Sequence, residues 1–389
     1  MKIYSPAFIT TKGRLSVGHG ANLVWCDVLG RRERQKGGYV EYFFPSWNHQ
    51  GKRLDTFGKQ DLENKLKNME EDFNRQLNLF GIEKYTEYRD TDSKSRENAK
   101  RYFIVLKEKK FIKYNECQYF LDIKEIVNRT NLLKILEEMR FAQGDQIRKR
   151  LVDLAYTLNG MYPISKKREF ATEMPGESES SQKINPIFDL AVSPLLFSEE
   201  SMDYSIDGSR TLLHGTFIPL LVWAGLFNKP FSKNISVHGY SLGDTEMAVD
   251  KFYEKINADI LNSDIMRYCA IRCTESFEDM EVNLDSISGG KKLLYRTLNL
   301  SKHILKHYGT QERETNEDEG IKEFIETMYP SKAISYFESE IFAISRNTHH
   351  KGRIDKEDVT RFLRNVNVIK SIFPITVKRI EEIVYDGKL

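Results

Sequence analysis

Gly18 and His19 stand where a predicted strand passes into a predicted helix, a placement that suits the binding of a polyphosphate. The strand is expected over residues 2–10 and the helix over residues 20–34. The free N–H groups and the positive dipole end of a helix attract anions there, and an imidazole adds a hydrogen-bond donor. A glycine and a histidine before a helix are a weak motif by themselves, because they also serve as ordinary capping residues.

A second group of polar residues occurs in the later half of the chain, beside an apolar helix and a strand. The helix is expected over residues 218–226 and the strand over residues 235–237. The polar residues around them are Asp207, Gly208, Ser209, His214, His238 and Gly239. Taken singly, the two histidines are more often packed or hydrogen-bonded core residues than catalysts. Their meaning therefore depends on the order in which other motifs accompany them.

The elements that must position these residues begin in a strand–helix–strand order. Residues 39–44 are β-branched and aromatic and predict a second, buried strand. From residue 60 to 80, apolar side chains recur three or four apart, which predicts an amphipathic helix. Residues 93–168 are helical and charged and are interpreted as an inserted segment, and residues 173–183 form a polar loop. We therefore expect a sheet that is interrupted and resumes after the loop.

Composition and charge narrow the class of protein. With 389 residues, of which 40% are hydrophobic and 30% charged, the chain is expected to be a soluble globular protein of more than one domain. No run approaches the roughly 20 apolar residues of a membrane span, and the first residues lack the apolar run of a secretory signal, so a cytoplasmic protein is expected. The four cysteines include no C-x-x-C pair, so neither a metal site nor a disulfide framework is predicted. The net charge of +2 does not indicate a broad polyanion-binding surface, although local patches can still hold RNA.

The order of the motifs resembles class I aminoacyl-tRNA synthetases of the methionyl, leucyl, isoleucyl and valyl group. Residues 15–19 are similar to the HIGH box, and Asn22 and residues 27–31 are similar to the helix that follows it. Residues 44–51 resemble the second-strand motif in which the family has Gly-Trp-Asp and then His-Gly. The most similar stretch is residues 203–239. It matches in order and spacing the family's glycine turn with an acid for the ATP ribose, its helix with one histidine, and its Val-His-Gly strand.

Both signature motifs of the family are degenerate in this sequence. Ser16 replaces the first histidine of the HIGH box and cannot carry a positive charge, and Asn48 replaces the acid of the second-strand motif. In the family, a lysine of the KMSKS loop neutralises charge on the ATP phosphates. Residues 242–250 stand in that place, with Glu246 instead of the first lysine and Asp250 as an added acid. Two carboxylates facing a triphosphate repel it, so this loop departs from the family's pattern at the chemical step unless Lys251 or Lys255 takes the place of the lysine.

The resemblance implies an α/β fold with a Rossmann-like parallel sheet as a catalytic domain of the class I synthetase type. An inserted connective segment, mostly helical, divides this domain, and a junction leads to a C-terminal α-helical bundle similar to an anticodon-binding domain. The first half of the nucleotide-binding domain covers residues 1–57, the insertion 58–185, the second half 186–260, and the junction with the bundle 261–389.

The resemblance also assigns roles to the candidate residues. The catalytic ones are His19 and Ser16. The residues implied to bind ATP, with Mg²⁺, are Gly18, Asn22, Asp207, Gly208, Ser209, His238 and Gly239. The amino-acid pocket is implied to lie beside Phe8, Ile9, Trp47, His214 and Trp223. By alignment Ser209 takes the place of the ribose acid, and Asp207 is close enough in the sequence to serve instead.

The function implied by the resemblance is that of a divergent aminoacyl-tRNA synthetase-like ligase of protein biosynthesis. Such an enzyme activates an amino acid with ATP as its adenylate and transfers it to tRNA or another acceptor. The alternative is a catalytically silent paralogue that keeps the fold as a binding or regulatory protein. The altered HIGH and KMSKS residues favour the silent paralogue, whereas the presence of Gly18, His19 and His238 favours the enzyme. The amino acid, the acceptor and the oligomeric state are left open.

Overall fold

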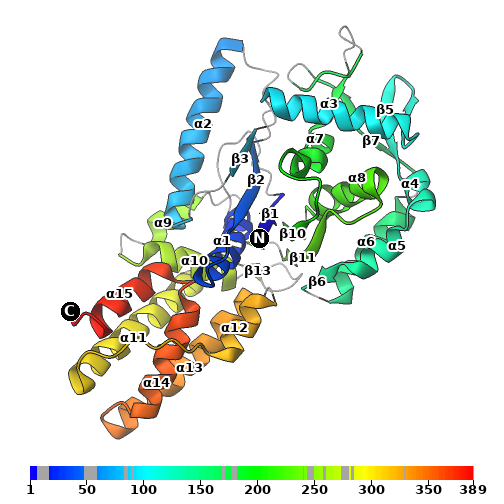
Figure 1. Ribbon diagram of the computed structural model, residues 1–389. Coiled ribbons are helices and arrows are strands. Elements are labelled where there is room, and N and C mark those ends of the chain that lie inside the picture. The colour runs from blue at the N-terminus through cyan, green and yellow to red at the C-terminus, as the bar shows by residue number, and fades with distance from the viewer. Residues whose placement is uncertain are drawn as a thin grey trace. The chain divides into compact units, whose positions relative to one another are not determined.

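The chain folds as two units that alternate along the sequence in this computed structural model (Figure 1). The first unit comprises Met1–Leu15, Gly38–Arg75 and Lys84–His238, and the second comprises Ser16–Gly37, Gln76–Glu83 and Gly239–Leu389. The residues that the structure describes are 1–6, 17–47, 59–82, 86–89, 92–142, 144–158, 160–168, 171–176, 182–209, 211–239, 241–242, 249–256, 260–272, 280–281, 284–327 and 329–388.

A parallel sheet forms the centre of the first unit. Its strands lie in the order β3-β2-β1-β10-β11-β6, and every neighbouring pair is parallel. Ile3 in β1 pairs with Tyr42 of β2 on one side and with Tyr204 of β10 on the other. The early and late parts of the chain therefore share one sheet, as the sequence predicts. The strands are β1 (Lys2–Tyr4), β2 (Glu41–Trp47), β3 (Thr86–Arg89), β6 (Arg140–Phe141), β10 (Met202–Gly208) and β11 (Ser232–His238).

The two edge strands of this sheet come from the segment interpreted as an insertion. β3 pairs with β2, and β6 pairs with β11. A strand as short as β6 has too few residues to show a periodic pattern, so it cannot be recognised from the sequence. The domain boundaries predicted after residues 57, 185 and 260 stay a prediction.

Helix α8 (Ile218–Phe227) belongs to the core of the first unit. Every residue from Ile218 to Leu226 is buried, because the segment is apolar on all sides. Asn228 then adopts the left-handed conformation, with a φ of 54°, and ends the helix. Helix α8 packs against α7 (Pro186–Val192) and α3 (Ser93–Glu108).

The rest of the first unit consists of short helices and antiparallel strands. In sequence order they are β4 (Ile112–Asn115), β5 (Gln118–Asp122), α4 (Ile123–Arg129), α5 (Leu132–Glu138), α6 (Asp145–Thr157), β7 (Met161–Pro163), β8 (Ser165–Lys167) and β9 (Gln182–Ile184). β5 pairs antiparallel with β4 and β7, and β8 pairs antiparallel with β9. The long helix α2 (Lys59–Leu79) is divided between the two units after Arg75.

The second unit is mainly helical, as the sequence predicts for the C-terminal part. Helix α11 packs against α10, α13 and α15, and α1 packs against α10 and α12. Leu293, Ile304, Phe337 and Ile380 lie in its core and are at most 1% exposed. No helix among the described residues is long and apolar enough to cross a membrane. Its elements are α1 (Val17–Gln35), β12 (Ser241–Leu242), α9 (Val249–Ile256), α10 (Asn262–Arg272), β13 (Met280–Glu281), α11 (Leu284–Tyr308), α12 (Glu319–Glu326), α13 (Pro330–Lys351), α14 (Lys356–Ile369) and α15 (Pro374–Val384).

Candidate functional site

The carboxyl ends of β10 and β11 bring four of the predicted site residues together in the first unit. The ladder pairs Asp207 with Val237 and Gly208 with His238. Just beyond it, the Ser209 N–H donates to the His238 carbonyl oxygen at 2.9 Å. A Cβ placed on Gly208 would lie 3.7 Å from Cε1 of the His238 ring, which is ordinary contact. Open α/β sheets bind their ligands at this edge, outside the carboxyl ends of the strands.

The Asp207 carboxylate is fully buried and is held by donors from the turn that follows it. Its Oδ1 accepts from the Gly208 N–H at 2.8 Å and from the Thr211 hydroxyl, and its Oδ2 accepts from the Thr216 hydroxyl at 2.7 Å. We call these four residues the Asp207 turn. Burial raises the pKa of Asp207 to about 6, although the three hydrogen bonds act in the opposite direction. The carboxylate therefore shapes the turn while remaining titratable near neutral pH.

Gly215 is the residue that lets this turn close around Asp207. It lies in a π-helical segment, Leu212–Phe217, and a π-helix is a rare conformation that occurs frequently at functional sites. A Cβ at Gly215 would lie 2.6 Å from Asp207 Oδ2 and 2.7 Å from Pro6 Cγ. Any larger residue would displace either the carboxylate or the proline, so the position requires glycine.

His214 faces an aromatic partner that comes from the predicted insertion. Its ring centroid lies 6.2 Å from that of Tyr162 in β7. Burial and then the charge of Lys166 lower the pKa of His214, and burial raises the pKa of Tyr162 to about 12. Both side chains are therefore neutral at pH 7, and together they offer hydrogen-bond donors and acceptors beside a cation.

The other residues predicted to line an amino-acid pocket are placed differently. Trp223 is fully buried in α8, and its ring centroid lies 5.4 Å from that of Phe227. Within the described part of the chain its indole N–H has no hydrogen-bond partner. Trp47 is the last residue of β2, and Phe8 and Ile9 lie outside the described residues. The assignment of these residues to a pocket stays a prediction.

In the second unit, helix α1 begins just before Gly18 and His19. Its first turn contains no acidic residue, so no carboxylate there opposes the attraction of the free N–H groups for an anion. His19 is half-buried, and Asn22 is buried further along the helix. A Cβ at Gly20 would lie 2.4 Å from the Phe80 ring, so the start of α1 packs closely against the turn after α2.

A buried ion pair fixes α1 within the second unit. The Asp27 carboxylate accepts from Arg31 Nε at 2.7 Å and from Arg267 Nη1 at 2.6 Å. Arg267 in α10 is fully buried and also donates to backbone carbonyls after α2 and after α14. The helix that carries His19 is thus tied by one guanidinium to segments far apart in the sequence.

Some residues on which the resemblance depends lie outside the part of the chain that the structure describes. They are Ser16, Asn48 and residues 243–248 of the KMSKS-like loop. Gly239 is described and is buried. Among the described residues, no group of three or more His, Cys, Asp or Glu side chains could hold a metal ion. A Mg²⁺ ion that enters with the phosphates of a nucleotide needs only one or two protein carboxylates.

No motif in the sequence singles out Thr211, Thr216, Tyr162 or Arg267. Two threonines that closely follow an Asp at a strand end are a usable signal, because their hydroxyls can satisfy a carboxylate that the fold buries. An acid inside the apolar part of α1, such as Asp27, likewise signals a buried cation, although the sequence does not say which one. Tyr162 carries no comparable signal.

Comparison with known proteins identifies the fold through structure and not through sequence. The sequence matches no protein-family model, and no curated protein matches it. The structure is similar to methionyl-tRNA synthetase from Mycobacterium tuberculosis bound by methionyl-adenylate, with a TM-score of 0.76 over 97% of this chain and 93% of that one, at 11% identity. This chain has the class I synthetase fold.

Two further structures of the Mycobacterium tuberculosis methionyl-tRNA synthetase agree with this result. A second complex with methionyl-adenylate has a TM-score of 0.75 and the apo form one of 0.71, both at 12% identity and over 98% of this chain. The match with this chain covers 93% of the length of the second complex and 91% of the length of the apo form. The expected fold class, a Rossmann-like parallel sheet with an inserted segment and a C-terminal helical bundle, is confirmed.

Proposed function

We propose that this protein is a divergent aminoacyl-tRNA synthetase-like ligase that activates an amino acid as its adenylate with ATP and Mg²⁺, in the cytoplasm. In this reaction a carboxylate oxygen of the amino acid attacks the α-phosphorus of ATP. The bond from that phosphorus to the pyrophosphate oxygen breaks, and pyrophosphate leaves. The acyl group then passes to tRNA or to another acceptor. The observation that carries the proposal is the likeness, over 97% of this chain, to a methionyl-tRNA synthetase that holds methionyl-adenylate.

In the second unit, the proposal assigns the phosphates to the start of α1. Gly18 leaves the backbone N–H groups accessible, and the His19 imidazole donates to an α-phosphate oxygen as charge develops on it. Ser16 adds a neutral hydrogen bond where the family has a second imidazole, and Asn22 supports the turn. The absence of acid from the first turn of α1 supports this assignment.

In the first unit, the proposal assigns the adenosine to the ends of β10 and β11. Both oxygens of Asp207 already accept hydrogen bonds from the Asp207 turn. We therefore assign the ribose contact to Ser209 and to the backbone of Gly208, which Asp207 positions. His238 and Gly239 line the same nucleotide site in this proposal.

The amino-acid pocket is assigned to the surroundings of His214, with Tyr162 as an added member. A neutral imidazole and a neutral phenol beside Lys166 can orient a polar ammonium and carboxylate without a fixed negative charge. Phe8, Ile9, Trp47 and Trp223 complete the pocket in this proposal.

Exchange of labelled pyrophosphate into ATP tests the proposal directly. The purified protein is incubated with each of the standard amino acids in turn, with and without tRNA, and one of them should support exchange. With that amino acid, His19→Ala should lower the exchange rate by roughly 10²-fold or more, because it removes a donor from the developing charge. His350→Ala, a change at an exposed histidine of α13, is the matched control and should leave the rate unchanged. Thermal unfolding of both variants separates a chemical loss from a folding loss.

The alternative function is that of a catalytically silent paralogue that binds a ligand or a partner. The observation that favours it is the engagement of the Asp207 carboxylate within its own turn, together with the altered residues Ser16, Asn48 and Glu246. If the wild type supports no exchange with any amino acid, the silent paralogue is the better description. If His19→Ala retains full exchange, the protein is an enzyme whose phosphate contacts lie elsewhere.

A further inference from the structure

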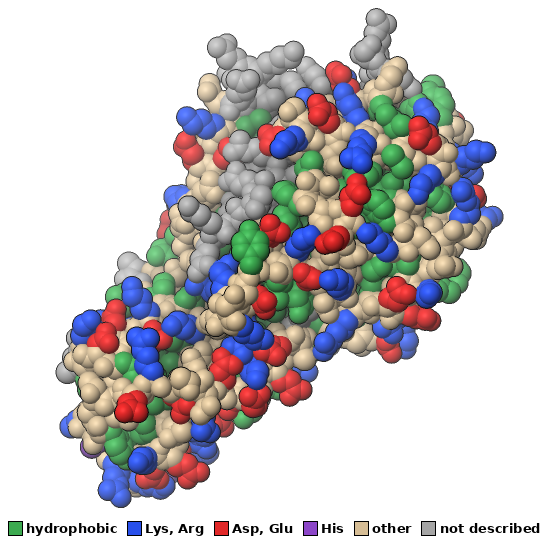
Figure 2. Space-filling model, viewed as in Figure 1, with side chains coloured by type: hydrophobic (Ala, Val, Ile, Leu, Met, Phe, Trp, Pro, Cys, Tyr) green, Lys and Arg blue, Asp and Glu red, His purple; other side chains and the backbone are tan. Residues whose placement is uncertain are grey.

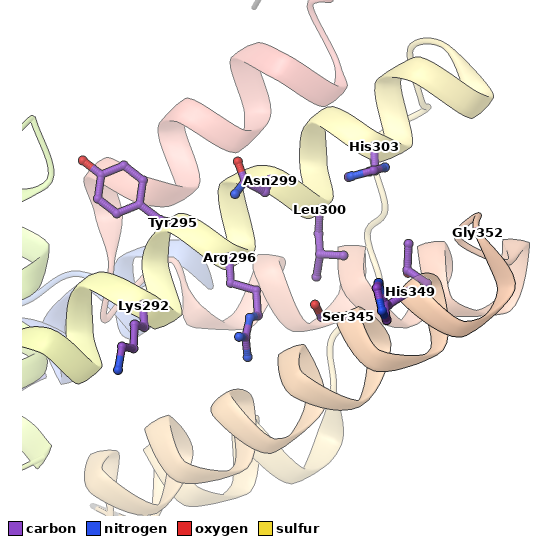
Figure 3. Close-up of a pocket in the computed structure, with 10 residues that line it drawn as sticks. Lys292, Tyr295, Arg296, Asn299, Leu300, His303, Ser345, His349 and Gly352 are labelled. Atoms are coloured by element: carbon purple, nitrogen blue, oxygen red, sulfur yellow. The ribbon is translucent and has the colours of Figure 1, made fainter.

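A polar pocket of about 510 Å³ lies between α11 and α13 in the second unit. Lys292, Arg296 and His303 line it from α11, and Ser345 and His349 line it from α13. Figure 3 shows Arg296 directed from α11 toward α13, with Ser345 and His349 on the facing side of α13. None of the lining residues is acidic. Most ligand pockets are lined mainly by apolar side chains with a few polar groups. This pocket is lined mainly by polar and charged side chains, so it suits a charged ligand.

The dipole of helix α11 does not explain Lys292 and Arg296, the two permanently charged side chains in this pocket. Basic side chains are favoured in the last turn of a helix, and that accounts for His349 in α13, whereas His303 lies before the last turn of α11. Lys292 and Arg296 lie in the middle of α11, one turn apart, where like charges repel each other. Among the described residues, neither of these cations has a carboxylate within ion-pair distance. The helix thus places two positive charges, neither of them in an ion pair among the described residues, beside a cavity.

Arg296 is held in a fixed orientation. Its guanidinium carbon lies 4.0 Å from the centroid of the Phe342 ring of α13, a cation–π contact that restrains the group. The acid that acts on Arg296 from a longer distance is Glu338, which does not line the pocket. Because the guanidinium is already ordered, it can bind an anion with little further loss of side-chain freedom.

We propose that this pocket binds a small metabolite that carries two or more phosphoryl groups. The fork of N–H donors on Arg296 matches phosphate oxygens, and Lys292 supplies a second charge about 6 Å along the helix axis, one turn away. Asn299 and Ser345, which also line the pocket, add neutral hydrogen-bonding groups. This site is separate from the residues assigned to adenylate formation, and the proposal does not depend on that assignment.

The distribution of charge favours a small ligand over a nucleic-acid strand. A strand is held by many phosphate contacts, which require an extended surface of Lys and Arg. The net charge of the chain is only +2, and Figure 2 shows Lys and Arg interspersed with Asp and Glu over the visible face. The charges of Lys292 and Arg296 instead line a pocket of about 510 Å³, a size suited to a single small molecule.

Isothermal titration of the full chain with sodium tripolyphosphate tests the proposal. The wild type should bind it, and Lys292→Gln and Arg296→Gln should each weaken binding by roughly tenfold or more, because each removes a charge-assisted contact. Lys302→Gln changes an exposed lysine of α11 that does not line the pocket, and it should bind as the wild type does. His19→Ala should also bind as the wild type does, because it alters only the proposed adenylate site.

A second measurement keeps the test independent of folding effects, since Arg296→Gln also removes the contact with Phe342. Lys292 is exposed, so Lys292→Gln should keep the melting temperature of the wild type. In the wild type, tripolyphosphate should protect Lys292 from acetylation, measured by peptide mass spectrometry, and should leave Lys302 reactive. Absence of binding, equal loss in the Lys292 and Lys302 variants, or equal protection of both lysines overturns the proposal.

Titration with a short single-stranded RNA distinguishes a site for a small metabolite from an RNA-binding surface. If the RNA binds through Lys292 and Arg296 at concentrations at which tripolyphosphate does not bind, the pocket belongs to an RNA surface and the small-metabolite proposal is wrong. If tripolyphosphate binds through these residues and the RNA does not compete with it, the proposal holds.

Discussion

Two buried carboxylates, one in each unit, are held in opposite ways. Asp207 in the first unit accepts hydrogen bonds from neutral donors of its own turn. Asp27 in the second unit is paired with two cations, Arg31 and Arg267, the latter 240 residues away in the sequence. Both carboxylates are at most 1% exposed, so the difference lies in the charge of the partners and not in burial. Neutral donors leave an acid titratable and shape the chain locally, whereas a cation ties distant segments together.

Removing Arg267 should have the largest effect on stability. Arg267→Met leaves Asp27 buried without its partner from α10, and this should lower the free energy of unfolding by about 3–5 kcal/mol. Urea denaturation followed by circular dichroism measures the loss. The matched control is Arg364→Met, which breaks a half-exposed ion pair with Glu314 and should cost less than about 1 kcal/mol.

The double variant Asp27→Leu/Arg267→Met sharpens this result. Because it also removes the buried Asp27 charge, which keeps only Arg31 as a partner once Arg267 is gone, it should recover part of the loss seen in the single variant. A single variant that is no less stable than the Arg364 control would show that the ion pair does not hold α1 in place.

Asp207→Asn tests the other carboxylate through its pH dependence. The folded pKa of about 6 exceeds the ordinary value of 3.8, so ionisation of Asp207 destabilises the folded state. The penalty is absent below about pH 4, grows as the pH rises, and is complete above about pH 6, where it amounts to about 3 kcal/mol. The unfolding free energy of the wild type should therefore fall relative to that of the variant over this interval.

Urea denaturation at a series of pH values provides the measurement for Asp207→Asn. The replacement also alters the hydrogen bond from Thr216, which shifts the difference by a constant amount, so the dependence on pH is the informative quantity. A difference between wild type and variant that is the same at pH 4 and pH 7 contradicts the raised pKa.

Thr216→Val should have a smaller effect, at the hydroxyl that donates to Asp207. Valine has a similar shape, so the variant removes the hydrogen bond at 2.7 Å and little else. Because the acceptor is charged at pH 7, the loss should be about 2 kcal/mol, and it should shrink as the pH falls through about 6 and Asp207 becomes neutral in the folded protein.

Thr348→Val is the matched control for Thr216→Val. The Thr348 hydroxyl is buried and donates to the backbone carbonyl of Ile344 within α13, so its loss should be about 1 kcal/mol and independent of this titration. Equal losses for the two variants at every pH would mean that Asp207 is not charged when Thr216 donates to it.

The sequence predicts the individual elements well where the pattern is periodic. The helices expected over residues 20–34 and 60–80 correspond to Val17–Gln35 and Lys59–Leu79. The strand expected over residues 39–44 corresponds to Glu41–Trp47. Hydrophobic periodicity is a local property, so it marks these elements without knowledge of their partners. It does not reveal β6, whose two residues join the sheet only because β11 lies beside them.

The candidate site is predictable in part for the same reason. The positions of Asp207, Gly208 and His238 at strand ends follow from the motif order, and the ladder places Gly208 opposite His238. The sequence does not indicate that Asp207 is already satisfied by Thr211 and Thr216. That depends on how the π-helical segment folds back over the strand end, which no local pattern records.

The sequence by itself determined the alternation of strands and helices, the glycine and histidine at the start of α1, and the resemblance to class I synthetases. Only the tertiary structure decided which acids are buried, which groups compensate them and which cations are left facing a pocket. The physical reason is that helix and strand patterns arise from neighbours in the sequence. Desolvation and charge pairing instead depend on groups brought together from distant parts of the chain, as Asp27 and Arg267 are.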